Sequence, residues 1–265
     1  MKKNTIAQLI ACAMASVGLS THSACAGGGG QARVAATDSV SPVNVDVFLT
    51  PGGKQVTLYA LMHASLRIVY EGIEIEVDPV HQLGERTVDY ASMPRARYIL
   101  VTHEHADHMD AQAIGLLTGE ATRLVTNARC AELLGKGEIM ANGDTLQLAP
   151  DIVVEAVPAY NTTPGREKFH PRGRDNGYIL TIDGLRIYLA GDTEDIPEMA
   201  SLEAIDVALL PCNQPYTMTP DQLVHAARMV RPRVVFPYHY GSTDVSTLPA
   251  RLQPDGIDVR IRDYQ

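Results

Sequence analysis

The stretch ARYILVTHEHADHMD, from Ala96 to Asp110, contains the two signals on which the interpretation of this chain depends. Its first half is a continuous β-prone run that is typical of a buried strand. Its second half holds three histidines and three acidic residues and almost nothing that could pack in a core. The polar cluster is therefore predicted to lie on a loop at the carboxyl end of a buried strand, where an inert loop would rarely concentrate so many ligand-type side chains.

The spacing within this cluster predicts metal binding. His103, His105, Asp107 and His108 form the pattern H-x-H-x-D-H. Side chains at positions i and i+2 of extended backbone point the same way, so His103 and His105 can grip one ion. Where the chain turns into the next helix, Asp107 and His108 can face a second ion. Other metal motifs do not fit, because H-E-x-x-H would need a histidine at position 107 and a zinc finger would need additional cysteines.

Three further ligand candidates also follow apolar strands. They are His170 in FHPRG, Asp192 in LAGDT and His239 in FPYHY. A carboxylate such as Asp192 can bridge two ions that lie ~3.5–4 Å apart, as in two-metal hydrolytic sites. The repeated use of strand ends predicts a site assembled at one edge of packed sheets.

The rest of the chain alternates short β-prone segments with helical ones. Strands are predicted in QVTLYAL, SLRIVY, IEIEVDP, TRLVTN, IVVEAVPAY, DVALLPC and RVVFPYHY, and a hairpin is predicted around Asp183-Gly184. Helices are predicted in MDAQAIGLLT, ARCAELLG and TPDQLVHAARMV. We expect one α/β domain over residues 44–265, in which two sheets pack together with helices outside.

The first 26 residues have the layout of a secretory signal. A basic start precedes an apolar run from Thr5 to Leu19 and an A-x-A type cleavage site at Ala24-Cys25-Ala26. An N-terminal membrane anchor and lipidation of Cys25 are the alternatives. Residues 27–43 are expected to be a flexible segment. No later segment approaches the ~20 apolar residues of a membrane helix, so the mature chain is predicted to lack an integral span and to be periplasmic or secreted.

Charge and cysteine content narrow the function further. The chain has a formal charge of −9, and removal of residues 1–26 leaves 20 basic and 31 acidic residues, a charge of −11. This balance argues against a nucleic-acid partner, since such partners favour a concentrated basic face. A small-molecule substrate is expected instead, and the oligomeric state is left open. In an oxidising compartment, Cys130 and Cys212 could pair or remain as buried free thiols.

Three motifs together resemble the metallo-β-lactamase superfamily. HEHADH is similar to its first metal motif, AGDT to its bridging-aspartate motif and YHY to its last histidine motif, and the resemblance covers roughly Val56 to Asp263. TLYALMHASLRIVYEG and IEVDPV resemble the branch that contains bacterial ascorbate-6-phosphate lactonases. The resemblance implies a four-layer αββα sandwich of two mixed β-sheets with helices on the outer faces.

The resemblance also implies a ligand set. His103, His105 and a third histidine would hold the first metal, and Asp192 would bridge it to a second metal. The second metal would be held by Asp107, His108 and His239. His63 is implied to line the substrate pocket, although a structural role is equally open.

The third histidine departs from the family pattern. Relatives often place it just after a strand, where this chain has Asn161 in PAYNTTPG, and the nearest histidine, His170, comes nine positions later. We favour His170, because imidazole binds divalent transition metals far better than a neutral amide does.

The function implied is hydrolysis with two divalent metal ions. Zinc is expected, with manganese or iron as alternatives. A hydroxide bridging the ions would attack a small ester, lactone or phosphodiester, with Asp107 orienting the nucleophile. A redox diiron relative would usually have an acid where this chain has His105, and nuclease relatives carry basic surfaces and an additional domain. The alternative is a non-catalytic metal-binding or interaction protein that retains the fold.

Overall fold

A computed structural model describes residues 44–264. The predicted signal segment 1–26, with Cys25, and the predicted flexible segment 27–43 lie outside the described residues. Within residues 44–264, most strands belong to two seven-stranded sheets, and a short hairpin pairs β5 (Gln82–Leu83) with β6 (Arg86–Thr87). The first sheet follows the order β1-β2-β3-β4-β7-β8-β9, with bounds Val45–Leu49, Gln55–Met62, Ser65–Tyr70, Ile73–Val77, Tyr98–Leu100, Arg123–Thr126 and Glu138–Ile139.

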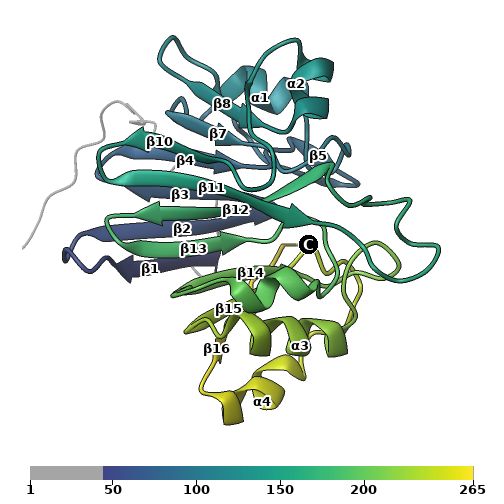
Figure 1. Cartoon of the computed structure of the whole chain (residues 1–265). Coiled ribbons are helices and arrows are strands. Elements are labelled where there is room, and N and C mark those ends of the chain that lie inside the picture. Colours follow the sequence, from purple (N-terminus) through teal and green to yellow (C-terminus); the bar gives the residue numbers. More distant parts are fainter. Residues whose placement is uncertain (1–43, 265) are drawn as a thin grey trace, which may run out of the picture. The chain divides into compact units, whose positions relative to one another are not determined.

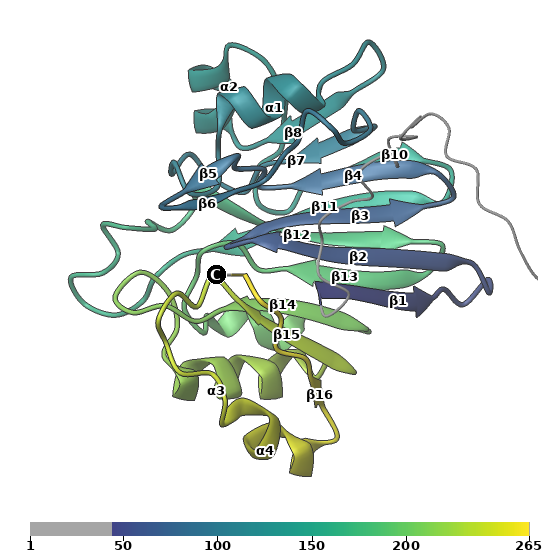
Figure 2. The same ribbon diagram turned by 180° about the vertical axis from the view of Figure 1, so that it is seen from behind.

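The second sheet comes from the later part of the chain. Its order is β10-β11-β12-β13-β14-β15-β16, with bounds Thr145–Ala149, Ile152–Ala159, Asp175–Ile182, Leu185–Leu189, Val207–Pro211, Val234–Tyr238 and Asp258–Val259. Both sheets are mixed, because antiparallel hairpins at one end give way to parallel pairs at the other. In Figure 1 the two sheets overlap face to face. Figure 2 shows the molecule from the opposite side, where the first sheet lies nearer to the viewer.

Four α-helices and two 3₁₀ segments lie in the described part of the chain. They are α1 (Ala111–Leu117), α2 (Ala128–Leu134), α3 (Pro220–Val230), α4 (Leu248–Leu252), η2 (Pro197–Ser201) and η3 (Gln253–Asp255). The predicted start of α3 is confirmed: Thr219 caps the helix through a capping box with Gln222, and Pro220 occupies the first turn. None of the helices among residues 44–264 has the length and apolar character needed to cross a bilayer.

Three hydrophobic clusters define the layers. The central cluster takes alternate residues from both sheets, for example Leu66 and Ile68 of β3 with Leu180 and Phe236 of the second sheet. One outer cluster joins the first sheet to α1 and α2, and the other joins the second sheet to α3 and α4. The αββα sandwich predicted from the sequence is confirmed. Cys130 and Cys212 are both buried and both free.

The parallel pairs fix where the polar loops emerge. β4, β7 and β8 run parallel in the first sheet, and β13, β14 and β15 run parallel in the second. Because the carboxyl ends of parallel strands meet at the same edge of a sheet, the segments that follow β7, β13 and β15 come together there. These are the segments that carry the histidine cluster, Asp192 and His239.

Candidate metal centre

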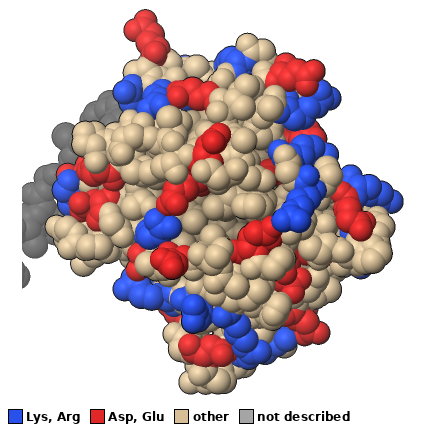
Figure 3. Space-filling model, in the orientation of Figure 1, with Lys and Arg blue, Asp and Glu red and all other residues tan. Residues whose placement is uncertain are grey.

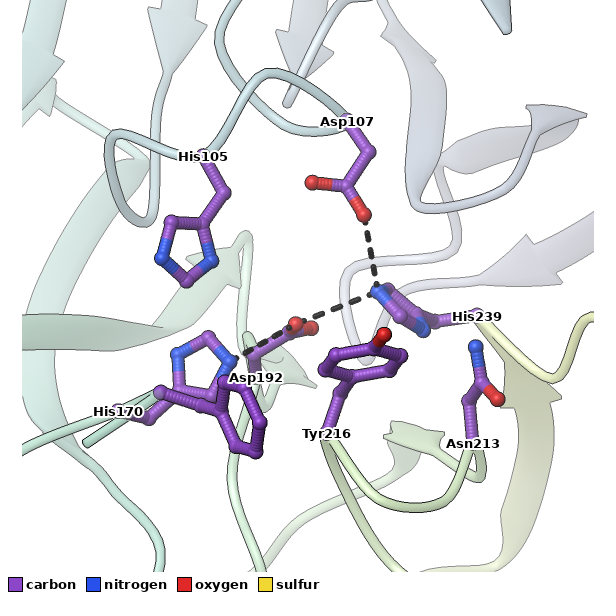
Figure 4. A pocket seen from close by; sticks show the side chains of 8 residues that line it. His105, Asp107, His170, Asp192, Asn213, Tyr216 and His239 are labelled. Atoms are coloured by element: carbon purple, nitrogen blue, oxygen red, sulfur yellow. Dashed lines mark ion pairs between the residues drawn. The ribbon is translucent and has the colours of Figure 1, made fainter. Parts of the chain in front are cut away.

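The predicted ligand residues meet at this common edge. The loop after β7 carries His103, His105, Asp107 and His108, and the three other residues arrive from the second sheet. Figure 4 shows five of these seven side chains pointing toward one centre: His105, Asp107, His170, Asp192 and His239. Six of the seven follow a strand of the core directly or within a short loop, so the rigid sandwich holds them in place. His170 differs, because it lies on the long connection between β11 and β12.

The side chains form two groups of four. The first group is His103, His105, His170 and Asp192, and the second is His63, Asp107, His108 and His239. Within each group, one possible ligand atom per residue lies within 4.8 Å of all the others. Each group therefore offers three imidazoles and one carboxylate, a donor set that suits zinc, manganese or iron.

Asp192 lies between the groups. Its Oδ1 is 3.2 Å from His108 Nε2, and its Oδ2 is 3.3 Å from His170 Nε2 and 3.2 Å from His239 Nε2. One carboxylate thus faces histidines of both groups, as a bridging ligand must. Gly191 makes this approach possible: its φ is +66°, and a Cβ there would lie 2.8 Å from the backbone oxygen of Asn176.

Three of the histidines are oriented through their outer nitrogens. His108 Nδ1 lies 2.8 Å from Asp78 Oδ2, and His170 Nδ1 lies 2.9 Å from Asp175 Oδ2. Thr102 Oγ1 donates to Asp78 and lies 3.0 Å from His103 Nδ1. Each contact turns Nε2 toward the centre, which is how metal-ligating histidines are commonly held. Asp78 and Asp175 were not among the predicted site residues, although Asp78 ends the strand-like run IEIEVD.

Several polar atoms at the centre have no hydrogen bond. They are His108 Nε2, Asp192 Oδ1 and both ring nitrogens of His239, all of them buried. Leaving such atoms unpaired costs about 1–3 kcal/mol each, so native proteins rarely do so. Lone pairs that converge without hydrogen bonds fit a bound cation, and the residues present therefore fit a two-metal centre.

The electrostatics of the centre agree with this donor chemistry for His103 and Asp192. For His108 and His239 they differ, because the charge of Asp192 outweighs burial and raises the pKa of both imidazoles, that of His239 to about 9. Burial lowers the pKa of His103 well below its usual value, and the neighbouring His108 lowers it further. Burial opposes ionisation of Asp192, yet the adjacent His108 and His239 hold its pKa well below the usual range. A neutral imidazole and an ionised carboxylate are the forms in which these groups bind metals.

His170, rather than Asn161, lies beside the bridging carboxylate. Asn161 turns its amide away from the centre, because Nδ2 donates to the backbone oxygen of Tyr216 at 2.8 Å and to that of Arg166 at 3.3 Å. The geometry thus favours His170 as the third histidine of the first group. Metal binding by any of these residues stays a prediction.

His63 lies beside Asp107 and His239 at the edge of the second group. Its Nε2 lies 3.2 Å from Asp107 Oδ2, and its ring centroid lies 3.8 Å from that of His239. The residue is only 8% exposed and is not part of the pocket wall. Contact with the substrate stays a prediction for His63, while its position beside Asp107 suggests a role at the metal centre.

A pocket of about 190 Å³ opens onto the centre. Its wall combines five of the predicted ligand residues with three residues that sequence analysis missed: Phe169, Asn213 and Tyr216. The rings of Phe169 and Tyr216 pack edge to face with centroids 5.1 Å apart. No sequence motif marks Asn213 or Tyr216 as pocket residues. Phe169 could have been found from its position directly before His170.

Comparison with known proteins agrees with the fold. Residues 57–239 match the family model described as the beta-lactamase superfamily domain. A UPF0173 metal-dependent hydrolase of Pyrobaculum neutrophilum is 30% identical over 212 residues, which cover 75% of this chain and 88% of the relative. A protein of the same description from Nitratidesulfovibrio vulgaris is 32% identical over 192 residues, which cover 69% of this chain and 79% of the relative.

Solved structures show the same relationship. One is the crystal structure of a proposed metal-dependent hydrolase from Parabacteroides distasonis. Its sequence is 52% identical to this chain, the TM-score is 0.80, and the match covers 83% of this chain and 99% of the Parabacteroides chain. Igni18, a metallo hydrolase from Ignicoccus hospitalis, is 26% identical in sequence, with a TM-score of 0.67. The match covers 79% of this chain and 95% of Igni18. The chain therefore belongs to the beta-lactamase superfamily and is a metal-dependent hydrolase with the metallo-β-lactamase fold.

Proposed function

We propose that this hydrolase uses two divalent metal ions to cleave a small ester or lactone. The observation that carries the proposal is the pair of four-residue groups with Asp192 between them at the base of a pocket. When bound, two such ions lower the pKa of a water molecule and polarise the oxygen under attack. His103, His105 and His170 would hold one ion and Asp107, His108 and His239 the other, with Asp192 shared.

The chain's own residues would position the reactants. Asp107 lies in the pocket wall with its side chain about one-third exposed, so its carboxylate can accept a hydrogen bond from the attacking water. Asn213 lies in the same wall and offers an amide that can hydrogen-bond to a carbonyl or ring oxygen. Phe169 and Tyr216 would pack against the apolar part of the substrate and exclude water on that side.

The pocket favours a carboxylic ester or lactone over a phosphodiester. Its volume of about 190 Å³ admits only a small reacting group. In the described residues its wall contains no lysine or arginine, the side chains that commonly bind phosphate oxygens. Figure 3 shows acidic and basic side chains interspersed on one face of the molecule, which supports a small-molecule substrate rather than a polyanion.

Activity assays test the proposal directly. Purified protein loaded with zinc, manganese or iron is assayed with an aryl ester, a simple lactone and a phosphodiester, with and without chelator. We expect ester or lactone hydrolysis that chelation abolishes and added metal restores, together with close to two ions per chain by elemental analysis. Faster cleavage of the phosphodiester would overturn the substrate class, and a content of at most one ion would overturn the two-metal centre.

We also propose that the mature protein acts outside the cytoplasm. The support is the signal-like sequence of residues 1–26, with Cys25 as an alternative lipid attachment site. Fractionation of the native host, followed by mass spectrometry of the N-terminus, tests this. We expect periplasmic or secreted protein lacking residues 1–26, and cytoplasmic protein with that segment intact would overturn export.

A further inference from the structure

His63 completes a symmetry between the two groups of side chains. The first group has three imidazoles and the carboxylate of Asp192. The second group has the carboxylate of Asp107, and it has three imidazoles only if His63 is included. The ligand set implied by the sequence resemblance leaves His63 out of the metal centre. The structure instead gives both groups the same donor composition.

The geometry of His63 fits a ligand. Zinc holds nitrogen ligands at about 2.0–2.1 Å, so neighbouring donor atoms around one ion lie about 3–4 Å apart. His63 Nε2 is 3.2 Å from Asp107 Oδ2, and the same carboxylate oxygen is 3.6 Å from His239 Nε2. The rings of His63 and His108 have centroids 5.9 Å apart, so the second group closes around one volume.

The backbone around His63 is held in an unfavourable conformation. His63 has φ +55° and His239 has φ +50°, both in the left-handed region that few residues other than glycine occupy. The backbone N–H of His239 donates to the oxygen of His63 at 3.1 Å, and the N–H of His63 donates to the oxygen of Tyr264 at 2.8 Å. Such strain persists where surrounding contacts enforce it, and it is commonest at functional sites.

We propose that His63 is a direct ligand of the second metal position. This inference rests on the proposed two-metal centre and extends it. With Asp192 shared, the first position has four protein ligands and the second has five. The second position should therefore hold its ion at least as firmly as the first, and loss of the His63 imidazole should weaken only one of the two ions.

A cobalt titration tests the assignment without relying on catalysis. Metal-free wild type, His63→Asn and His63→Gln are titrated with Co²⁺, while visible absorption and elemental analysis after desalting are recorded. Asparagine tolerates positive φ, so the backbone is retained. Glutamine keeps an N–H donor that can reach Asp107, but its amide is a poor transition-metal ligand.

We expect wild type to bind two cobalt ions. In both His63 variants the ion at the first position should bind normally. The ion at the second position should bind at least ~10-fold more weakly with altered visible bands, since ligand loss changes the coordination geometry. Asp175→Asn, which removes the partner behind His170, should weaken the other ion. His225→Asn should change neither, because that side chain is 62% exposed and pairs with Asp195.

Three results would overturn the inference. Retention of both ions with unchanged bands in His63→Asn would show that His63 is no ligand. Wild-type binding by His63→Gln would show that His63 acts only as a hydrogen-bond donor to Asp107. Binding of fewer than two ions by the wild type would overturn the proposed two-metal centre and this inference together. Thermal unfolding of each metal-free variant establishes that the compared proteins are folded.

Discussion

The backbone N–H of Asn161 donates a hydrogen bond of 2.9 Å to the carbonyl oxygen of His170. This bond closes the loop that leaves β11 and returns to β12, so His170 is brought back to the strand end that Asn161 occupies. A histidine that lies nine positions after Asn161 in the sequence thereby reaches Asp192. Asn161 and His170 are therefore neighbours in space although nine positions separate them along the chain.

The loop between Asn161 and His170 is fastened by buried groups. Glu194, which is fully buried, accepts hydrogen bonds from the backbone N–H groups of Thr162 and Thr163 at 2.8 and 2.6 Å. Arg166 contacts the Gln214 side chain. The Arg166 contact and the Asn161 bond to Tyr216 join the His170 loop to the segment that carries Tyr216, so His170 and this part of the pocket wall are held together.

Asn161→Ala should therefore leave the metal content unchanged and loosen the pocket wall. Loss of the Nδ2 bond to the Tyr216 carbonyl removes a buried hydrogen bond, and we expect the free energy of unfolding to fall by about 1–3 kcal/mol. Elemental analysis and urea unfolding measure the two quantities. His170→Ala is the matched comparison and should lower the metal content. A full metal complement in His170→Ala with a loss in Asn161→Ala would reverse the assignment of the third ligand.

Asp192→Asn should damage activity more than His170→Ala. Asp192 faces histidines of both groups, so removal of its charge loosens both ions, whereas water can partly replace a single terminal ligand. With metal in excess, we expect kcat/KM to fall roughly 10³-fold for Asp192→Asn and roughly 10²-fold for His170→Ala. Steady-state kinetics on the best ester substrate provide the comparison. The opposite order would mean that Asp192 is not the bridge.

Much of this centre was predictable because its residues follow strands with strong local signals. The run ARYILVT predicts a buried strand, and β7 with the polar loop after it confirms that prediction. The hairpin at Asp183-Gly184 and the capped start of α3 were likewise evident from local turn and capping chemistry. Local sequence patterns of this kind predict the observed elements correctly because the burial of their apolar residues stabilises the same conformation.

The features that the sequence did not reveal depend on long-range contacts. The edge strand β1 is held by pairing with β2. Its Asp46 also accepts hydrogen bonds from Arg260 and Arg262, which lie more than 200 residues away in the sequence. Asn213 and Tyr216 enter the pocket only because their loop packs on the His170 loop. Short strands such as β9 and β16 gain their regularity from a neighbouring strand rather than from their own composition.

Tyr216→Ala should weaken substrate binding selectively. Tyr216 is 45% exposed and packs its ring against Phe169 in the pocket wall, so its removal changes the binding surface more than the core. For an aryl ester we expect KM to rise about 10-fold, since an aromatic contact contributes about 0.5–1.5 kcal/mol beyond its area. Tyr216→Phe should retain the wild-type KM. An equal effect of Tyr216→Ala on a methyl ester and an aryl ester would show that the ring does not contact the apolar group.

The buried carboxylate of Glu76 gives a stability prediction. Glu76 on β4 is 1% exposed, and neither of its carboxylate oxygens makes a hydrogen bond. Arg67 Nε lies 4.0 Å from Glu76 but 2.7 Å from Glu74, with which Arg67 forms a two-bond pair. Burial raises the pKa of Glu76 well above its usual value, and the charge of Arg67 offsets this only in part.

Glu76→Gln should therefore stabilise the protein at alkaline pH. A raised pKa in the folded state means that stability is fully present below the unfolded pKa of about 4.3 and is lost as pH rises through the folded pKa. Glutamine carries no charge at any pH, so the variant avoids this loss. We expect its free energy of unfolding to exceed that of the wild type at pH 8, with the difference shrinking as the pH approaches 5. Urea unfolding at several pH values measures both curves, and Glu74→Gln, which breaks the Arg67 pair, should instead destabilise the protein. A Glu76→Gln variant less stable than the wild type at pH 8 would show that the ionised carboxylate is well accommodated by Arg67.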